Sequence, residues 1–206
     1  MRTTEVNAVE RSTGGHRAQT SQRHVPGEPG LWVLLFGDMI VFALLFTVYL
    51  HQRGKEPGLF AESQRALHPV LGATNTLVLL TSSILVVFAT YALRRPELHH
   101  LARPLILAGA LVGSGFVAIK TFEYHQMLAA GITPSTNEFF MFYFVVTGLH
   151  LAHLTVGLIV LAFLSALVRK PQLTTMQMAH FEAGACYWHM VDLLWIVIFP
   201  LIFLVG

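Results

Sequence analysis

The sequence predicts an all-α membrane protein, folded as a bundle of five transmembrane helices. Hydrophobic residues make up 54% of the chain and charged residues only 12%, about half the charged share of an average soluble domain. The mean hydropathy is +0.62, and several apolar runs reach the roughly 20 residues that a helix needs to cross a bilayer. Ten-residue segments of alternating hydrophobicity, typical of a membrane β-barrel, do not occur.

The five spans follow from the apolar runs and from the breakers between them. We place them at Leu31–Leu50, Val70–Leu93, Pro104–Leu128, Glu138–Val168 and Ala179–Val205. Each span must be helical because a segment in hydrocarbon has to satisfy its own backbone hydrogen bonds. The connections between the spans are short, so sequential helices should be antiparallel neighbours in one bundle.

Turn and cap residues mark the ends of these helices. Pro26–Gly30 is rich in proline and glycine and leads into the first span. Pro96 should end the second helix and Gly131 the third, while Asn137 is a suitable N-cap for the fourth. Pro200 should kink the fifth helix unless its neighbours satisfy the carbonyl that it frees.

Residues 1–25 predict a disordered polar tail, because they are rich in Gly, Ser, Thr and Arg and have no apolar run. Residues 26–206 then form the membrane domain. Nine lysines and arginines fall on the side of the tail: four in the tail, three between the second and third spans and two between the fourth and fifth. The other side has three. Basic residues are enriched on the cytoplasmic side, so we predict a cytoplasmic N-terminus and a C-terminus outside.

The cysteine count and the charge limit the possible sites and partners. The single cysteine, Cys186, rules out an internal disulfide and a metal site made of several cysteines. The net charge is only +2 and no run of lysines or arginines is present, so nothing indicates a nucleic-acid partner.

Ionisable residues inside the spans are the candidate functional groups, since each costs about 2.5–3.5 kcal/mol at membrane depth. Lys120 and Glu123 are three residues apart on one helix and share a face, which predicts a self-neutralising ion pair. A proton or substrate role is the alternative for this pair. Asp38 stands alone among apolar neighbours and has no partner in its own helix. It is either a proton-handling group or a structural hydrogen-bond donor.

His150 and His153 share a face of the fourth span. They could ligate a metal or haem if facing helices added ligands. However, the His-Glu-x-x-His and Glu-x-x-His patterns of known metal bundles are missing. We expect these histidines to bond to carboxylates of the third and fifth spans and to fix helix packing, with His150 and Glu182 pairing the fourth and fifth helices.

The fifth span carries a polar and aromatic stripe. Trp188, Asp192 and Trp195 are spaced i, i+4, i+7, and His189 can also reach Asp192. These groups predict structural contacts inside the bundle. We also expect Tyr187, Trp188 and Trp195 to be interface aromatics, since rings with a polar end are favoured at the membrane surface.

Taken together, these motifs resemble subunit III of the haem–copper oxidases, from about Pro26 to Gly206. The resemblance rests on Lys120-x-x-Glu123-Tyr124, on Thr147-Gly-Leu-His-x-x-His153 with Gly157, and on Glu182 followed by Tyr187-Trp-His-x-Val-Asp192-x-x-Trp195. Five helices are similar to the shorter bacterial form, which lacks the first two of seven. Its N-terminus lies inside, in agreement with the charge count.

One segment departs from the respiratory members of this family. Gly37-Asp38-Met39 stands where they carry Ser-Glu. Together with Pro26-Gly-Glu-Pro-Gly-x-Trp32, it resembles the branch associated with nitric oxide reductases (the NorE type). The shorter aspartate also places in question a proton role taken from the family glutamate.

The resemblance implies an accessory subunit without a redox centre, in a terminal oxidase of aerobic electron transport. Its implied partners are a catalytic haem–copper subunit I, a subunit II or cytochrome c subunit, and membrane lipids. Haem and copper would lie in the partner, and the complex in a bacterial plasma membrane. The implied role is to stabilise the catalytic subunit and to assist proton uptake, with Asp38 as the candidate residue.

Three alternatives remain open at this point. One is an accessory subunit of a nitric oxide reductase. Another is a stand-alone haem or metal enzyme of the membrane, built on His150, His153 and His189. The third is a proton-coupled transporter that uses Asp38 and Glu123.

Overall fold

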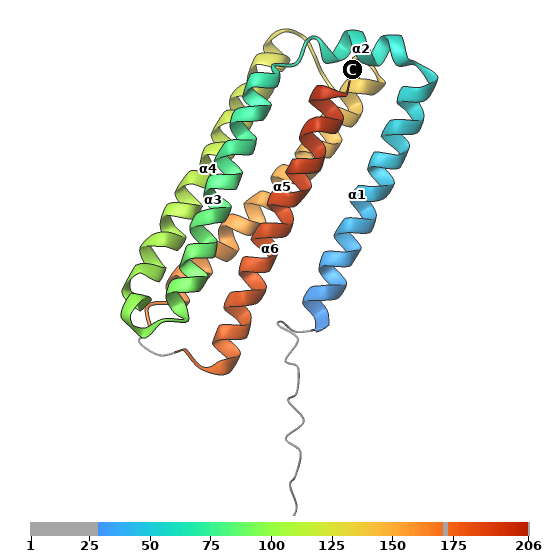
Figure 1. Ribbon diagram of the computed structural model, residues 1–206. Coiled ribbons are helices and arrows are strands. Elements are labelled where there is room, and N and C mark those ends of the chain that lie inside the picture. The colour runs from blue at the N-terminus through green and yellow to red at the C-terminus, as the bar shows by residue number, and fades with distance from the viewer. Residues whose placement is uncertain (1–28, 171–172, 206) are drawn as a thin grey trace, which may run out of the picture.

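The computed structural model describes residues 29–170 and 173–205, so the tail predicted over residues 1–25 lies outside the described part. Five of the described helices are long and apolar enough to cross a membrane (Figure 1). They are α1 (Pro29–Lys55), α3 (Pro69–Leu93), α4 (His99–Ala129), α5 (Glu138–Leu167) and α6 (Thr175–Phe199). The predicted bundle of five membrane helices is confirmed, while its orientation in the membrane stays a prediction.

Two of the membrane helices begin before the apolar runs that predicted them. α4 begins at His99, five residues before the predicted start, directly after a short 3-10 helix at Pro96–Leu98. α6 begins at Thr175, because Thr174 and Gln177 form a capping box ahead of the apolar run. Hydropathy detects only the part of a helix inside hydrocarbon, so these polar first turns were missed.

Two further elements differ from the expectation. A short helix, α2 (Pro57–Gln64), lies between α1 and α3 and was not predicted. At Pro200 the last helix changes into a π-helix, Pro200–Leu204, whose final bond joins the Val205 N–H to the Pro200 carbonyl at 2.9 Å. Proline lacks the donor that an α-helix needs, and the wider helical turn accommodates it. As predicted, Asn137 caps α5 by accepting a bond from the Phe140 N–H.

The helices are arranged around α6. α3 and α4 lie side by side along their whole length, and α6 contacts both α3 and α5 (Figure 1). α1 stands at the edge of the bundle and packs mainly against α5 and α6. Of the most apolar stretch of α6, 56% is buried inside the bundle, whereas for α1 the share is only 17%. α6 is therefore the central helix of the bundle and α1 is peripheral.

α1 meets the bundle through one narrow face. Its buried apolar side chains are Leu35, Phe42 and Tyr49, which are seven residues apart and so lie in line along the helix. The other faces of α1 expose large apolar side chains, among them Phe36, Ile40 and Leu44. Exposed apolar surface of this kind suits contact with lipid.

The Trp188 ring of α6 fills a slot between two glycines on neighbouring helices. A Cβ atom at Gly113 of α4 would lie 2.7 Å from the ring, and one at Gly157 of α5 would lie 2.8 Å from it. Both distances are below van der Waals contact. The absence of a side chain at these two positions is what lets α4, α5 and α6 close around the tryptophan.

We expect Gly157→Ala to destabilise the bundle by about 1–3 kcal/mol, because the Trp188 ring is held from both sides and cannot move away from the new carbon. Gly148→Ala is the matched control on the same helix, since its nearest neighbour would be at an ordinary 3.8 Å. The measurement is thermal unfolding of the purified protein in detergent. Equal melting of the two variants would contradict the tight packing.

Candidate functional site

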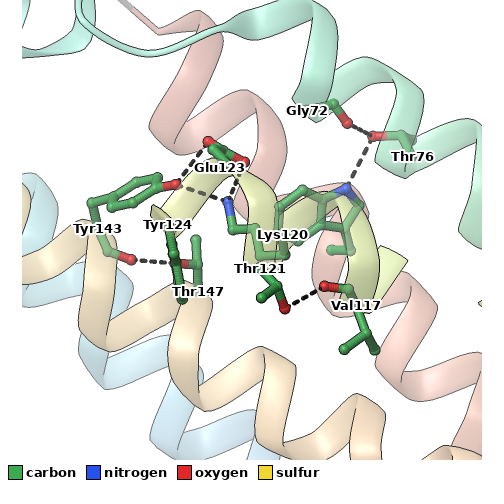
Figure 2. Close-up of polar contacts among 10 residues, drawn as sticks. Gly72, Thr76, Val117, Lys120, Thr121, Glu123, Tyr124, Tyr143 and Thr147 are labelled. Atoms are coloured by element: carbon green, nitrogen blue, oxygen red, sulfur yellow. Dashed lines mark hydrogen bonds and ion pairs between the residues drawn. The ribbon is translucent and has the colours of Figure 1, made fainter. Parts of the chain in front are cut away.

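The most deeply buried charges of the described structure form one closed cluster between α4 and α5. Lys120 Nζ lies 3.0 Å from Glu123 Oε2, and it also donates to Tyr143 Oη at 3.0 Å. The Tyr143 hydroxyl in turn donates to Glu123 Oε1 at 2.7 Å (Figure 2). All three side chains are buried. The ion pair expected from the spacing is present, and it has gained a tyrosine from the next helix.

Aromatic rings surround the lysine of this cluster. Lys120 Nζ lies 4.7 Å from the centroid of the Tyr143 ring and 5.3 Å from those of Trp195 and Phe203. Ring faces attract a cation more strongly when water is excluded. The charge of Lys120 is therefore balanced by groups from α4, α5, α6 and the π-helix. This arrangement is suited to joining helices, and the buried ammonium is not exposed to a substrate in solvent.

Tyr143 is the member of the cluster that sequence reasoning missed. It lies 20 residues from Glu123, on another helix, and a tyrosine in an apolar span carries no distinctive signal. A second hydroxyl contact reinforces the same region, where Tyr124 Oη and Thr147 Oγ1 are 2.6 Å apart. Thr147 also donates to the Tyr143 carbonyl at 2.6 Å (Figure 2).

Asp38 is paired after all, with a histidine from another helix. Asp38 Oδ2 lies 3.3 Å from His153 Nε2, and the Phe42 ring packs edge-on against the imidazole with a centroid distance of 5.6 Å. We expected carboxylates of the third and fifth spans to bind His153, and this was wrong. The pairing depends on how α1 is rotated about its own axis, which the spacing of residues along one helix does not reveal.

One contact of His153 places a hydrogen on Nδ1 of its ring. His153 Nδ1 lies 2.8 Å from the Leu149 carbonyl, which can only accept, so Nδ1 carries a hydrogen. A bond between Nε2 and Asp38 then needs one further proton, held either by the imidazole or by the carboxyl. The contact between Asp38 and His153 therefore joins α1 to α5.

His150 does not bind a carboxylate as expected. It is fully buried, and its ring lies between Phe116, at a centroid distance of 5.3 Å, and Trp195, at 5.2 Å. Neither of its nitrogens has a hydrogen-bond partner within the described ranges. These two aromatic side chains, from α4 and α6, offer the imidazole no acceptor.

Glu182 pairs with an arginine rather than with His150. Its Oε1 lies 2.9 Å from Arg94 Nη2, at the C-terminal end of α3. The Arg94 side chain is 63% exposed, so this contact lies at the surface of the bundle. The expected pairing of the fourth and fifth membrane helices through His150 and Glu182 is wrong. Glu182 instead joins the start of α6 to the end of α3.

Three further polar groups of α6 face α3. His189 Nδ1 lies 2.6 Å from Ser83 Oγ, and Asp192 faces the same serine. Trp195 Nε1 donates to Thr76 Oγ1 at 3.1 Å. The expected contacts inside the bundle are therefore made. His189, however, bonds to Ser83 of α3 and not to Asp192 as the spacing suggested.

The three aromatic residues expected at the membrane interface lie inside the protein. Trp188, Trp195 and Tyr187 are all buried, and Tyr187 Oη donates to the His153 carbonyl at 3.3 Å. Their rings fill the contacts between helices. The sequence shows that these residues have polar ends, but it does not show whether lipid headgroups or neighbouring helices receive them.

The described residues contain no group of three or more His, Cys, Asp or Glu side chains that could hold a metal ion. The three histidines considered for such a site point to different neighbours. His150 packs on aromatic rings, His153 binds Asp38 and His189 binds Ser83. This geometry does not support a stand-alone metal or haem enzyme built on them.

A family model described as "Cytochrome c oxidase subunit III" matches residues 8–206. The chain belongs to the cytochrome c oxidase subunit III family. It is 28% identical to "Cytochrome c oxidase subunit 3" of Bacillus sp. (strain PS3), over 86% of this chain and 84% of that protein. It is 30% identical to "Cytochrome bo(3) ubiquinol oxidase subunit 3" of Pseudomonas putida, with the same coverage. It is 28% identical to "Cytochrome c oxidase subunit 3" of Bacillus subtilis (strain 168), over 86% of this chain and 85% of that protein.

These relatives confirm the family expected from the sequence motifs. Their names are those of oxidase subunits and do not support the branch associated with nitric oxide reductases. Membership in this family, together with five apolar helices, makes the chain an integral membrane protein. The names also imply a terminal oxidase complex that contains further subunits.

We expect Lys120→Met to destabilise the folded chain by about 3–5 kcal/mol, because it leaves the buried Glu123 carboxylate without its counter-ion. Arg94→Met is the matched control, since it breaks an ion pair that is largely exposed and worth at most about 1 kcal/mol. Thermal unfolding of both variants measures the difference. Similar losses would mean that Lys120 and Glu123 are not paired in the folded protein.

Proposed function

We propose that this chain is the accessory subunit III of a haem–copper terminal oxidase in the plasma membrane of a bacterium. The observation that carries the proposal is the family match over residues 8–206. The structure is compatible with it, since the Lys120–Glu123 pair with Tyr143 and the Asp38–His153 pair hold helices together. In this role the chain packs against the catalytic subunit and keeps it intact during turnover.

The redox centres of the proposed complex lie in its other subunits. Haem and copper belong to catalytic subunit I and its redox partner, a subunit II or a cytochrome c subunit, and this chain binds neither. Two features of the chain support this division. It has one cysteine, and it lacks the His-Pro-Glu-Val-Tyr segment of the catalytic subunit.

The Asp38–His153 pair is the group that we propose for proton uptake. Asp38 lies nine residues into α1, or roughly 14 Å along the helix at 1.5 Å per residue, near the predicted cytoplasmic side. In this proposal, a proton bound between the two side chains leaves and returns without either side chain changing its partner. Membrane lipids are the further proposed partner, because the exposed faces of α1 are apolar.

Purification through a tag on this chain, in mild detergent, tests the proposal. We expect a catalytic haem–copper subunit to co-purify, and we expect the chain to show no Soret band once it is separated from that subunit. Mass spectrometry identifies the partner. A nitric oxide reductase partner would select the other branch, and stoichiometric haem on the isolated chain would refute an accessory role.

We expect Asp38→Asn to leave assembly intact but to shorten the turnover lifetime of the complex or to slow its proton uptake. The amide keeps the shape of the carboxyl but cannot release a proton to His153. Gly37→Ala is the control, because the added carbon would have no neighbour within 4 Å. Unchanged lifetime and proton uptake in Asp38→Asn would make Asp38 a packing residue.

A further inference from the structure

Four buried side chains present polar atoms that no other described residue bonds. The atoms are Nδ2 and Oδ1 of Asn75, both ring nitrogens of His150, Nε1 of Trp188 and Oδ1 of Asp192. Asn75 and His150 are 0% exposed, Trp188 1% and Asp192 5%. A buried polar atom without a partner costs about 1–3 kcal/mol, and native proteins contain few of them. Together, these atoms require an explanation.

The four side chains lie in the interior where α3, α4, α5 and α6 meet. Asn75 is the residue before Thr76 in α3, and Thr76 accepts the indole bond of Trp195 at 3.1 Å. His150 packs on that same Trp195 ring, and Lys120 lies 5.3 Å from it. One end of this interior is therefore the Lys120–Glu123 ion pair.

Trp188 and Asp192 continue the same interior toward the other end of the bundle. They lie on one stripe of α6 with Trp195, spaced i, i+4, i+7. Trp188 faces Gly113, and the Cβ position of that glycine is 3.2 Å from Ser82 Oγ. Asp192 faces the next residue, Ser83, whose hydroxyl also contacts His189.

The rings of His150 and Trp188 are confined by their neighbours. The His150 ring is bounded by Phe116 and Trp195, which have no oxygen to offer. The Trp188 ring is held between Gly113 and Gly157. A water molecule can both donate and accept, and buried water typically bonds to about three otherwise unsatisfied polar groups.

This interior adjoins a hollow at the surface of the bundle. The hollow has a volume of about 510 Å³ and lies between α1, α3 and α6. Its polar lining includes Arg94, Glu182 and His189. Since His189 also bonds to Ser83, it connects the hollow to Asp192 and the interior beyond.

We propose that Asn75, His150, Trp188 and Asp192 bind a column of internal water molecules, which exchanges with solvent through the hollow beside His189. The column continues the polar path from the Arg94–Glu182 pair toward the buried Lys120–Glu123 pair. The ligand is water, held by donors and acceptors of three helices. This site is independent of the proposed role in an oxidase, because it depends only on groups inside this chain.

Radiolytic hydroxyl-radical footprinting of the complex tests the site, since radicals formed from bound water oxidise the side chains beside it even when these are buried. We expect Trp188 to be oxidised in the wild-type protein, and a several-fold loss of that oxidation in Asn75→Leu/Asp192→Leu. Phe139, which is also 0% exposed and packs against Phe60 and Phe140, is the internal reference. Its rate should not change. An unchanged Trp188 rate in the double variant would overturn the proposal.

A high-resolution experimental structure of the wild-type complex keeps the test decisive if the double variant fails to fold. We expect density peaks within hydrogen-bond distance of Asp192 Oδ1 and Trp188 Nε1. Direct pairing of these atoms with other side chains, with no solvent peak beside them, would overturn the proposal.

Discussion

The cost of placing charge in hydrocarbon is the constraint on which the rest of this structure depends. Lys120 and Glu123 neutralise each other, and the Tyr143 hydroxyl bonds to both. Because the surrounding medium cannot hydrate either group, the pair is tied to whatever helices supply its partners. It draws α5 against α4, and it brings the rings of Trp195 and Phe203 over the ammonium. The buried ion pair is therefore the contact that positions α4, α5, α6 and the π-helix relative to one another.

The remaining contacts divide the bundle into a tight part and a loose part. Around α6, glycines allow the close approach of neighbouring helices, and Trp188 fills the space between them. α1 has only a narrow buried face, and much of its attachment is polar. Tyr49 donates to the Leu201 carbonyl, Gln52 donates to Glu138, and Asp38 meets His153. Lipid gives no hydrophobic drive toward helix association, so these polar contacts contribute strongly to where α1 stands.

This division suits an accessory subunit of an oxidase. Four closely packed helices can support a neighbouring protein, while the peripheral helix α1 brings Asp38 to His153 of α5. The cytochrome c oxidase subunit III family match covers both parts of the chain, since it runs from residue 8 to residue 206. The ionisable groups thus have a structural task in the core and, as we propose, a chemical one at the edge.

The amino-acid sequence by itself determined the number of membrane helices, the family and the Lys120–Glu123 pair. Each of these follows from local information: an apolar run long enough to cross a bilayer, a motif, or a spacing of three residues on one helix. Hydropathy and spacing within a helix are properties of the chain, and tertiary packing did not override them here. The capping role of Asn137 was also visible, because a cap acts within its own first turn.

Only the tertiary structure decided which helices meet and through which side chains. It paired Asp38 with His153, Glu182 with Arg94 and His189 with Ser83, and it placed the aromatic residues of α6 inside the bundle. Such pairings depend on the rotation of each helix about its axis and on the tilt between helices. Both are set by the packing of all neighbours at once, whereas a spacing pattern describes one helix at a time.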